Sequence, residues 1–269
     1  HADSKIYVIR NTIGEPVNFY PRYSSYIDIY NRWFTDPGVW SYSNGYDSNV
    51  FTTSDYILNF DLTGATNFTF YSNLTISSQI KFYSATLTIG SYNLTTGTIT
   101  GTSSSAYVKT NSTGLLKREV TNEATLFPVG DTSYNPISIT NNSGTNDVFG
   151  VRVKSEVKQY PSISYNSTKG YNSIQREWTL TKTNSNGGSG VKITFNWNAS
   201  DEVNGSINTP ALFFYNSSGN WEKLTTGVTV DENEHIITLS GYTSDLSSTR
   251  FAIGDTDYGF VTPPTISSF

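Results

Sequence analysis

Three short stretches decide the fold: Asn73-Leu74-Thr75-Ile76, Thr86-Leu87-Thr88-Ile89 and Asn93-Leu94-Thr95-Thr96. They are nearly interchangeable: the first two alternate polar and apolar side chains with the two-residue period of a half-buried strand, and the third differs in having Thr96 in place of the final isoleucine. Similar strand-like segments recur about every six or seven residues between 56 and 120, separated by Gly or Asn corners. This repetition predicts a β-solenoid, in which each turn of the chain stacks on the previous one. An ordinary meander of hairpins is the alternative.

From residue 126 onward the strand patterns become longer and alternate cleanly, with Asn- and Gly-rich turns between them. About seven such strands in about 130 residues is typical of an immunoglobulin-like sandwich. We therefore predict an all-β chain with a solenoid-like region of short strands followed by an antiparallel β-sandwich. The predicted strands of the second half are 137–140, 149–153, 177–180, 191–197, 211–215, 236–239 and 250–253.

The expected division of the chain follows from these patterns. Residues 1–120 hold the aromatic-rich N-terminal strands and the solenoid-like region, and residues 121–258 hold the sandwich. Residues 259–269 are interpreted as a linker or the start of a following module.

Composition excludes several classes of function. The 269 residues include 26 Asn, 36 Ser and 37 Thr but neither Cys nor Met, so thiolate metal sites and cysteine nucleophiles are ruled out. The net charge is −5 and the basic residues are scattered, so no nucleic-acid partner is expected. No apolar run approaches the roughly 20 residues of a membrane span, so membrane insertion is not expected either. No cofactor is predicted.

Five strings of the second half are specific enough to compare with known modules: Leu126-Phe127-Pro128-Val129-Gly130-Asp131, Tyr134-Asn135-Pro136-Ile137, Ile174-Gln175-Arg176-Glu177-Trp178-Thr179-Leu180, Phe195-Asn196-Trp197-Asn198 and Arg250-Phe251-Ala252-Ile253-Gly254-Asp255. In this order they resemble a β module common in very large surface and secreted proteins of bacteria that use the type IX secretion route. The preceding segments 87–94 and 114–118 are similar to the solenoid-like part that often comes before this module.

The resemblance covers about residues 55–256 and implies an extracellular or cell-surface location within a multi-module chain, with no family activity to transfer. The final segment 263–269 also resembles the opening strand of an immunoglobulin-like module of the IPT/TIG type.

The aromatic N-terminal section is the main candidate binding region. Tryptophan and tyrosine rings stack on the apolar faces of sugars, while Asn and Asp side chains bond to sugar hydroxyls. The alternative is that the rings plug the end of the solenoid or fill a seam between domains. The predicted glycan-binding residues are Trp33, Trp40, Tyr42, Asn44, Tyr46 and Asp47.

The titratable residues give weaker signals. Only two histidines exist, and His235 lies in a polar turn, where a solvated side chain is expected; a copper site that joins it to His1 is the alternative. Asp201 lies in a turn-like stretch and is expected to cap backbone amides or stay hydrated. Asp255 and Asp257 form a weak calcium candidate without the glycine and distal glutamate of an EF-hand loop.

These patterns favour a non-catalytic extracellular module of a bacterial surface protein, acting in adhesion or as a structural or filament element. A carbohydrate-binding module that uses the aromatic loop is the first alternative, and a secreted glycan-active enzyme is the second. The expected partners are adjacent modules of the same or identical chains, with glycans or other cell-surface components as further candidates.

Overall fold

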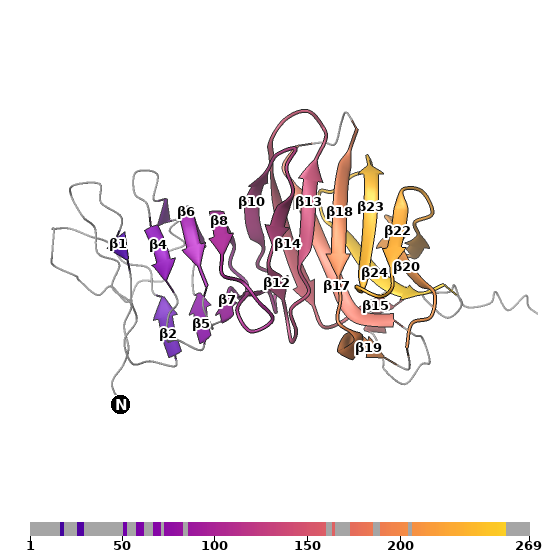
Figure 1. Ribbon diagram of the computed structural model, residues 1–269, viewed down its shortest axis with the longest axis horizontal. Helices are drawn as coiled ribbons and strands as arrows, with labels where there is room; N and C mark the ends of the chain where they lie inside the picture. The colour runs from indigo at the N-terminus through magenta and orange to yellow at the C-terminus, as the bar shows by residue number, and fades with distance from the viewer. Residues whose placement is uncertain are drawn as a thin grey trace, which may run out of the picture.

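The computed structural model describes residues 73–82, 86–159, 173–184, 189–203 and 206–256, and strands at 17–18, 26–29, 51–52, 58–61, 67–70 and 163–164. In this part of the chain the only helical element is a short 3-10 turn, η1 (Ala199–Asp201). The predicted all-β class is therefore confirmed. Short strands in an upper and a lower row lead into the taller strands of the second half (Figure 1).

The first half is a solenoid made of two parallel sheets between which the chain alternates. Every pair within these sheets is parallel, so the chain travels around a full coil before it meets itself, which hairpins cannot do. The solenoid prediction is confirmed, and a meander is wrong. The first sheet contains β1 (Val17–Asn18), β3 (Phe51–Thr52), β4 (Leu58–Asp61), β6 (Leu74–Lys81), β8 (Leu94–Thr100) and β10 (Leu116–Val120); the second contains β2 (Tyr26–Ile29), β5 (Asn67–Phe70), β7 (Thr86–Thr88), β9 (Val108–Lys109) and β12 (Val129–Gly130).

The register gives the length of a coil. Leu74 pairs with Leu94 and Leu94 with Leu116, so successive coils take 20 residues (94 − 74) and 22 residues (116 − 94). One coil holds about three of the strand-like segments seen in the sequence. The stretch at 86–88 belongs to the opposite sheet, half a coil away from the two stretches that it resembles.

Asparagine side chains tie successive coils together at one corner. The Asn93 backbone N–H donates to Asn73 Oδ1 at 2.8 Å, and the Leu115 N–H donates to Asn93 Oδ1 at 3.0 Å. The hydroxyls of Ser91 and Ser112 lie 3.1 Å apart and join the same two coils as the Leu115–Asn93 bond. These side chains satisfy backbone donors at a corner where the sheet hydrogen bonds stop.

Strand β10 joins the two halves of the molecule. It pairs in parallel with β8 on one side and antiparallel with β14 (Asp147–Lys154) on the other, so one sheet runs from the solenoid into the sandwich. The expected division after residue 120 falls at the end of this shared strand.

The second half is a sandwich of two antiparallel sheets (Figure 1). All seven predicted strand segments of this half lie in it. The larger sheet continues from β10 through β14, β17 (Ser173–Lys182), β24 (Thr249–Asp255), β20 (Pro210–Tyr215) and β21 (Trp221–Lys223), with β19 (Glu202–Val203) beside β17; the facing sheet has the order β11 (Thr125–Phe127), β13 (Ile137–Asn141), β18 (Val191–Asn196), β23 (Ile236–Tyr242) and β22 (Val228–Asp231). A two-stranded sheet pairs β15 (Lys158–Gln159) with β16 (Ile163–Ser164).

One hydrophobic core extends through both halves. It runs from Ile80 and Leu87 in the solenoid to Trp178 and Phe251 in the sandwich, all fully buried. The Trp178 ring meets Phe195 edge to face with ring centres 5.5 Å apart. The described chain contains no helix with the length and hydrophobicity that a membrane crossing requires.

Candidate functional site

The predicted glycan-binding residues, all between 33 and 47, lie outside the described residues, and so does Asp257. Asp255 is described and buried at the end of β24. Its Oδ2 accepts from the Asn208 backbone N–H at 3.0 Å and its Oδ1 from the Thr209 hydroxyl at 2.6 Å. Among the residues that the structure describes, no three His, Cys, Asp or Glu side chains gather as a metal site would require.

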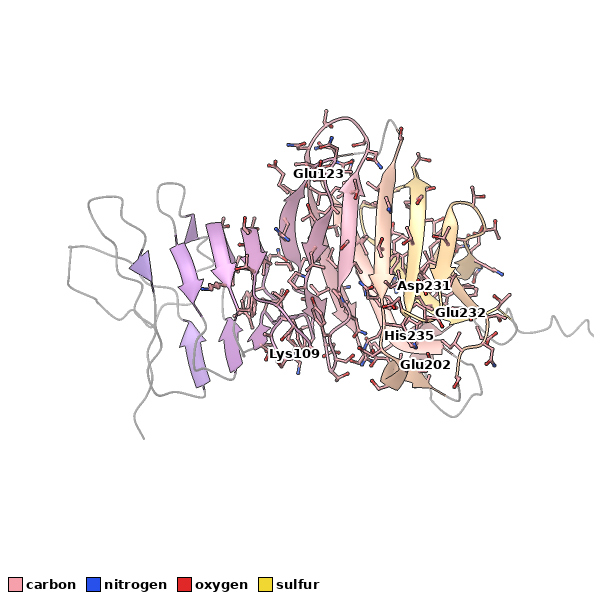
Figure 2. All side chains as sticks on the ribbon, viewed as in Figure 1. Lys109, Glu123, Glu202, Asp231, Glu232 and His235 are labelled. Atoms are coloured by element: carbon pink, nitrogen blue, oxygen red, sulfur yellow. The ribbon has the colours of Figure 1, made fainter. Side chains whose placement is uncertain are left out.

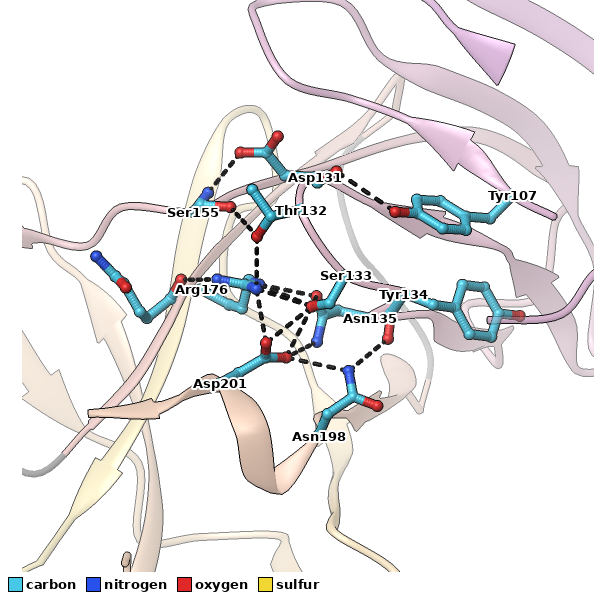
Figure 3. Close-up of polar contacts among 11 residues, drawn as sticks. Tyr107, Asp131, Thr132, Ser133, Tyr134, Asn135, Ser155, Arg176, Asn198 and Asp201 are labelled. Atoms are coloured by element: carbon cyan, nitrogen blue, oxygen red, sulfur yellow. Dashed lines mark hydrogen bonds and ion pairs between the residues drawn. The ribbon is translucent and has the colours of Figure 1, made fainter. Parts of the chain in front are cut away.

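The densest polar cluster lies where the solenoid meets the sandwich (Figure 3). Its residues come from three separate parts of the sequence: the turn after β12, the strand β17 and the turn η1. The turn after β12 needs Gly130, because a Cβ there would lie 2.0 Å from the Ser133 carbonyl oxygen. We call Thr132, Ser133, Asn135, Arg176, Asn198 and Asp201 the joint network.

Arg176 is the centre of the joint network. Its Nη2 lies 2.6 Å from Asp201 Oδ1, and the two side chains are only 5% and 3% exposed. Its Nε donates to Asn135 Oδ1 at 2.9 Å, and Nη2 also lies 2.8 Å from the hydroxyls of Thr132 and Ser133. The remaining nitrogen, Nη1, donates to the carbonyl of Gln175 at 2.6 Å. Each nitrogen of this guanidinium therefore has an acceptor.

Asp201 is surrounded by donors in the same way. Besides Arg176, its carboxylate accepts from the Asn135 side-chain amide at 2.6 Å, from Asn198 at 3.1 Å and from the Ser133 hydroxyl at 2.9 Å. The expectation that this residue would cap amides or stay hydrated is wrong. A buried carboxylate needs this many donors because removal from water disfavours its charge.

Burial also sets the protonation behaviour around the joint network. It lowers the pKa of the Arg176 guanidinium, and the neighbouring Asp201 carboxylate opposes that shift. It raises the pKa of Tyr107, whose hydroxyl donates to the carbonyl of Asp131, and the Asp131 carboxylate adds to that rise. With its donors and acceptors bonded to one another, the joint network can hold the two halves together but presents no free base or nucleophile.

A second, partly exposed group lies between the start of β19 and the turn before β23, where Figure 2 labels Glu202 and His235. The Trp197 Nε1–H donates to Glu202 Oε1 at 3.2 Å, and the His235 ring meets the Trp197 ring at 5.3 Å. His235 Nε2 lies 3.9 Å from Glu202 Oε1. His235 adopts a positive φ of 54° and its side chain is 34% exposed, so the prediction of a solvated turn residue is only partly right.

Sequence reasoning missed the joint network, although a signal for it was present. In β17 the alternation places Ile174, Arg176, Trp178 and Leu180 on one face, and three of these four are core residues. A single arginine on a core-facing row requires a buried acidic partner. Asn135, Arg176 and Asn198 lie far apart in the sequence, and the fold brings them together.

Comparisons with protein-family models, with curated proteins and with solved structures find no match for this chain.

Proposed function

We propose that the chain is a non-catalytic module of a bacterial cell-surface protein that serves as a rigid structural element in adhesion or in a surface filament. The observation that carries the proposal is β10, which belongs to both the solenoid and the sandwich. Domains joined by a linker move relative to one another. Here the hydrogen bonds of a sheet and one core cross the junction, and these contacts resist bending.

The length of the shared sheet fits a spacer. Its main path has ten strands in succession, from β1 to β21. Neighbouring strands lie about 4.8 Å apart, so this path covers about 43 Å. Two clamps hold the junction: the joint network, and Arg118, whose Nε donates to the Gly97 carbonyl of β8 at 2.9 Å and whose Nη1 donates to the Leu126 carbonyl of β11.

The use of ionisable residues supports a structural role. The four described carboxylates with the least exposure are paired or hydrogen-bonded within the fold: Asp201 to Arg176, Glu177 to Arg250 at 3.9 Å, Asp147 to Lys182 at 3.4 Å, and Asp255 to Thr209. A catalytic acid or base needs access to a substrate proton. These four buried carboxylates have no such access.

The proposal includes an extracellular location, with adjacent modules of the same or identical chains as partners. It is tested in a bacterium that carries the gene, with antibodies against residues 73–256. We expect labelling of intact cells, and we expect an in-frame deletion of this segment to reduce attachment or filament assembly. Labelling that appears only after lysis, or turnover of a substrate by the purified chain in a hydrolase screen, contradicts the proposal.

Carbohydrate binding is the alternative function, because segment 33–47 contains the aromatic and polar residues predicted to bind glycans. A glycan array separates the two hypotheses. Sub-millimolar binding to one glycan that disappears in Trp40→Ala favours the carbohydrate-binding module, and an array without such binding favours the structural element.

A further inference from the structure

The core face of the larger sandwich sheet holds a lysine and a carboxylate side by side on neighbouring strands. Lys182 of β17 pairs in register with Phe149 of β14, and Asp147 lies two residues before Phe149 on the same face of β14. Lys182 Nζ is 3.4 Å from Asp147 Oδ2, and the two side chains are 2% and 3% exposed. The centre of the Phe149 ring lies 5.7 Å from the same nitrogen. Among the residues that the structure describes, Lys182 is the only buried lysine.

This pair differs from the Arg176–Asp201 pair of the joint network in its length and in its chemistry. The Arg176–Asp201 contact is 2.6 Å, whereas the Lys182–Asp147 contact exceeds the range of about 2.7–2.9 Å that is usual for a charge-assisted hydrogen bond. An arginine keeps its proton in proteins, but a lysine amine can lose one and then act as a nucleophile. The members of the second pair can therefore react with one another.

Burial favours the reactive form of the Lys182–Asp147 pair. Removal from water disfavours both charges. Transfer of one proton from Nζ to Oδ2 removes both at once and leaves a neutral amine beside a carboxylic acid, so no further acid or base is needed. Nζ already approaches the carboxyl group as closely as groups in a near-attack arrangement, about 3–3.5 Å.

Hydrogen-bond donors surround the carboxyl group of Asp147. Its Oδ1 accepts from the Val148 backbone N–H at 2.7 Å and from Asn184 Nδ2 at 3.1 Å, and its Oδ2 accepts from the Asn184 backbone N–H at 2.8 Å. When an amine adds to the carboxyl carbon, Oδ1 becomes an oxyanion. The two donors on Oδ1 lie where they stabilise that charge, as the donors of an oxyanion hole do.

We propose that Lys182 and Asp147 condense into an amide that joins β17 to β14 covalently. After the first proton transfer, Nζ adds to Cγ of Asp147 and the C–N bond forms. A second proton moves from Nζ to Oδ2, the bond between Cγ and Oδ2 breaks, and Oδ2 leaves as water. One ammonium and one carboxylate thus become one amide and one water molecule, with no oxidant or other reactant.

The bond does not depend on the structural role proposed above, since any protein with this buried pair could form it. The test is the intact mass of the purified full chain, measured after denaturation. We expect a mass lower than that of the sequence by one water molecule, because the covalent bond persists when the fold is lost.

Digestion with trypsin locates the missing water. Cleavage after Lys and Arg gives separate peptides 119–152, 177–182 and 183–192 from a chain without the bond. With the bond, cleavage after Lys182 is blocked and 119–152 stays attached to 177–192. The Lys154–Glu156 pair is an internal control, because its atoms lie 3.3 Å apart but its side chains are 28% and 57% exposed. Cleavage after Lys154 should be complete.

Variants assign the reaction to the two side chains. Lys182→Met removes the amine, and Asp147→Asn replaces the carboxylate by an amide of the same shape that does not accept the lysine proton. Each variant is expected to have the full mass of its own sequence. Lys154→Met, the matched control, should lose one water molecule like the unmodified chain.

Three results would overturn the proposal: an unmodified chain with the full mass of its sequence, complete release of peptide 177–182, or a loss of water that persists in Lys182→Met. If neither Lys182→Met nor Asp147→Asn folds, the intact mass and the peptides of the unmodified chain still decide the question.

Discussion

Arg176 is a buried cation whose charge is compensated by hydrogen bonds and by an ion pair. All of its nitrogens reach acceptors, and its carboxylate partner is surrounded by further donors. Such a pair contributes little net stability compared with apolar residues of the same size. Its effect is specificity, because the network closes only when the turn after β12, the strand β17 and η1 meet in one arrangement.

Removal of Arg176 alone is therefore expected to be severe. Arg176→Met leaves Asp201 buried without its cation, and we expect a loss of about 3–5 kcal/mol in the free energy of unfolding. Addition of Asp201→Asn should restore part of that loss, since the orphaned charge disappears. Urea unfolding of the two single variants and the double variant measures the coupling. Lys192→Met, an exposed substitution, is the control, with a change within about 0.5 kcal/mol.

Three tyrosines give the chain a predictable response to alkali. Burial raises the pKa of Tyr107, Tyr134 and Tyr242, so in the folded chain these phenols stay neutral above pH 10. In the unfolded chain they ionise near pH 10. Stability is thus fully present below pH 10 and falls as the pH rises through the higher pKa values of the folded state. Tyrosinate absorbance and circular dichroism, recorded together, should show these three phenols ionising only as the fold is lost. Ionisation of all tyrosines near pH 10 with the fold intact would contradict this.

At the scale of the elements, the solenoid was predictable from its repeats and the details of its coils were not. The stretches at 73–76 and 93–96 stack in register as their likeness indicates. The likeness of 86–89 is misleading, because both sheets of a coil demand the same alternation and the sequence does not say which sheet a strand joins. The seven sandwich strands predicted from the sequence were found because their core-facing side chains are apolar and alternate; the shorter strands β11, β19, β21 and β22 were not among them. The joint network was not, since its members lie far apart in the chain.

The Asn73 and Asn93 side chains, which bond successive coils at one corner, allow a local prediction about the coils. Asn93→Ala removes the acceptor of the Leu115 N–H, and we expect a loss of about 1–2 kcal/mol. Hydrogen exchange at the Leu115 amide should become faster while amides in β17 keep their protection. Asn93→Asp retains an acceptor oxygen and should show a smaller effect. An unchanged exchange rate at Leu115 in the alanine variant would show that the side chain does not hold the coil.

At the scale of the whole molecule, the shared strand β10 and the shared core couple the solenoid to the sandwich. A solenoid by itself unfolds in steps, because each coil touches only its neighbours. Here the last coils also contact the sandwich through β10 and β12. The coils nearest the junction are therefore part of the same cooperative unit as the sandwich.

This coupling predicts one transition for residues 86–256. Hydrogen exchange in β17 reports on the sandwich, and hydrogen exchange in β8 and β9 reports on the coils. Both should give the same midpoint in urea, and Arg176→Met should shift both by the same amount. A β8 midpoint that stays in place while the β17 midpoint moves would mean that the two halves unfold separately.

The joint at β10 and β12 also decides where the chain can change its size. These two strands attach the C-terminal end of the solenoid to the sandwich. Coils can therefore be gained or lost only upstream of them. Each insertion of about 20 residues adds one strand spacing, about 4.8 Å, to the long axis. We expect related chains to differ upstream of β8 by whole coils, while the distance along the sequence from Gly130 to Asp201 stays nearly constant. The number of coils thus sets the length of the module, while its junction with the sandwich stays the same.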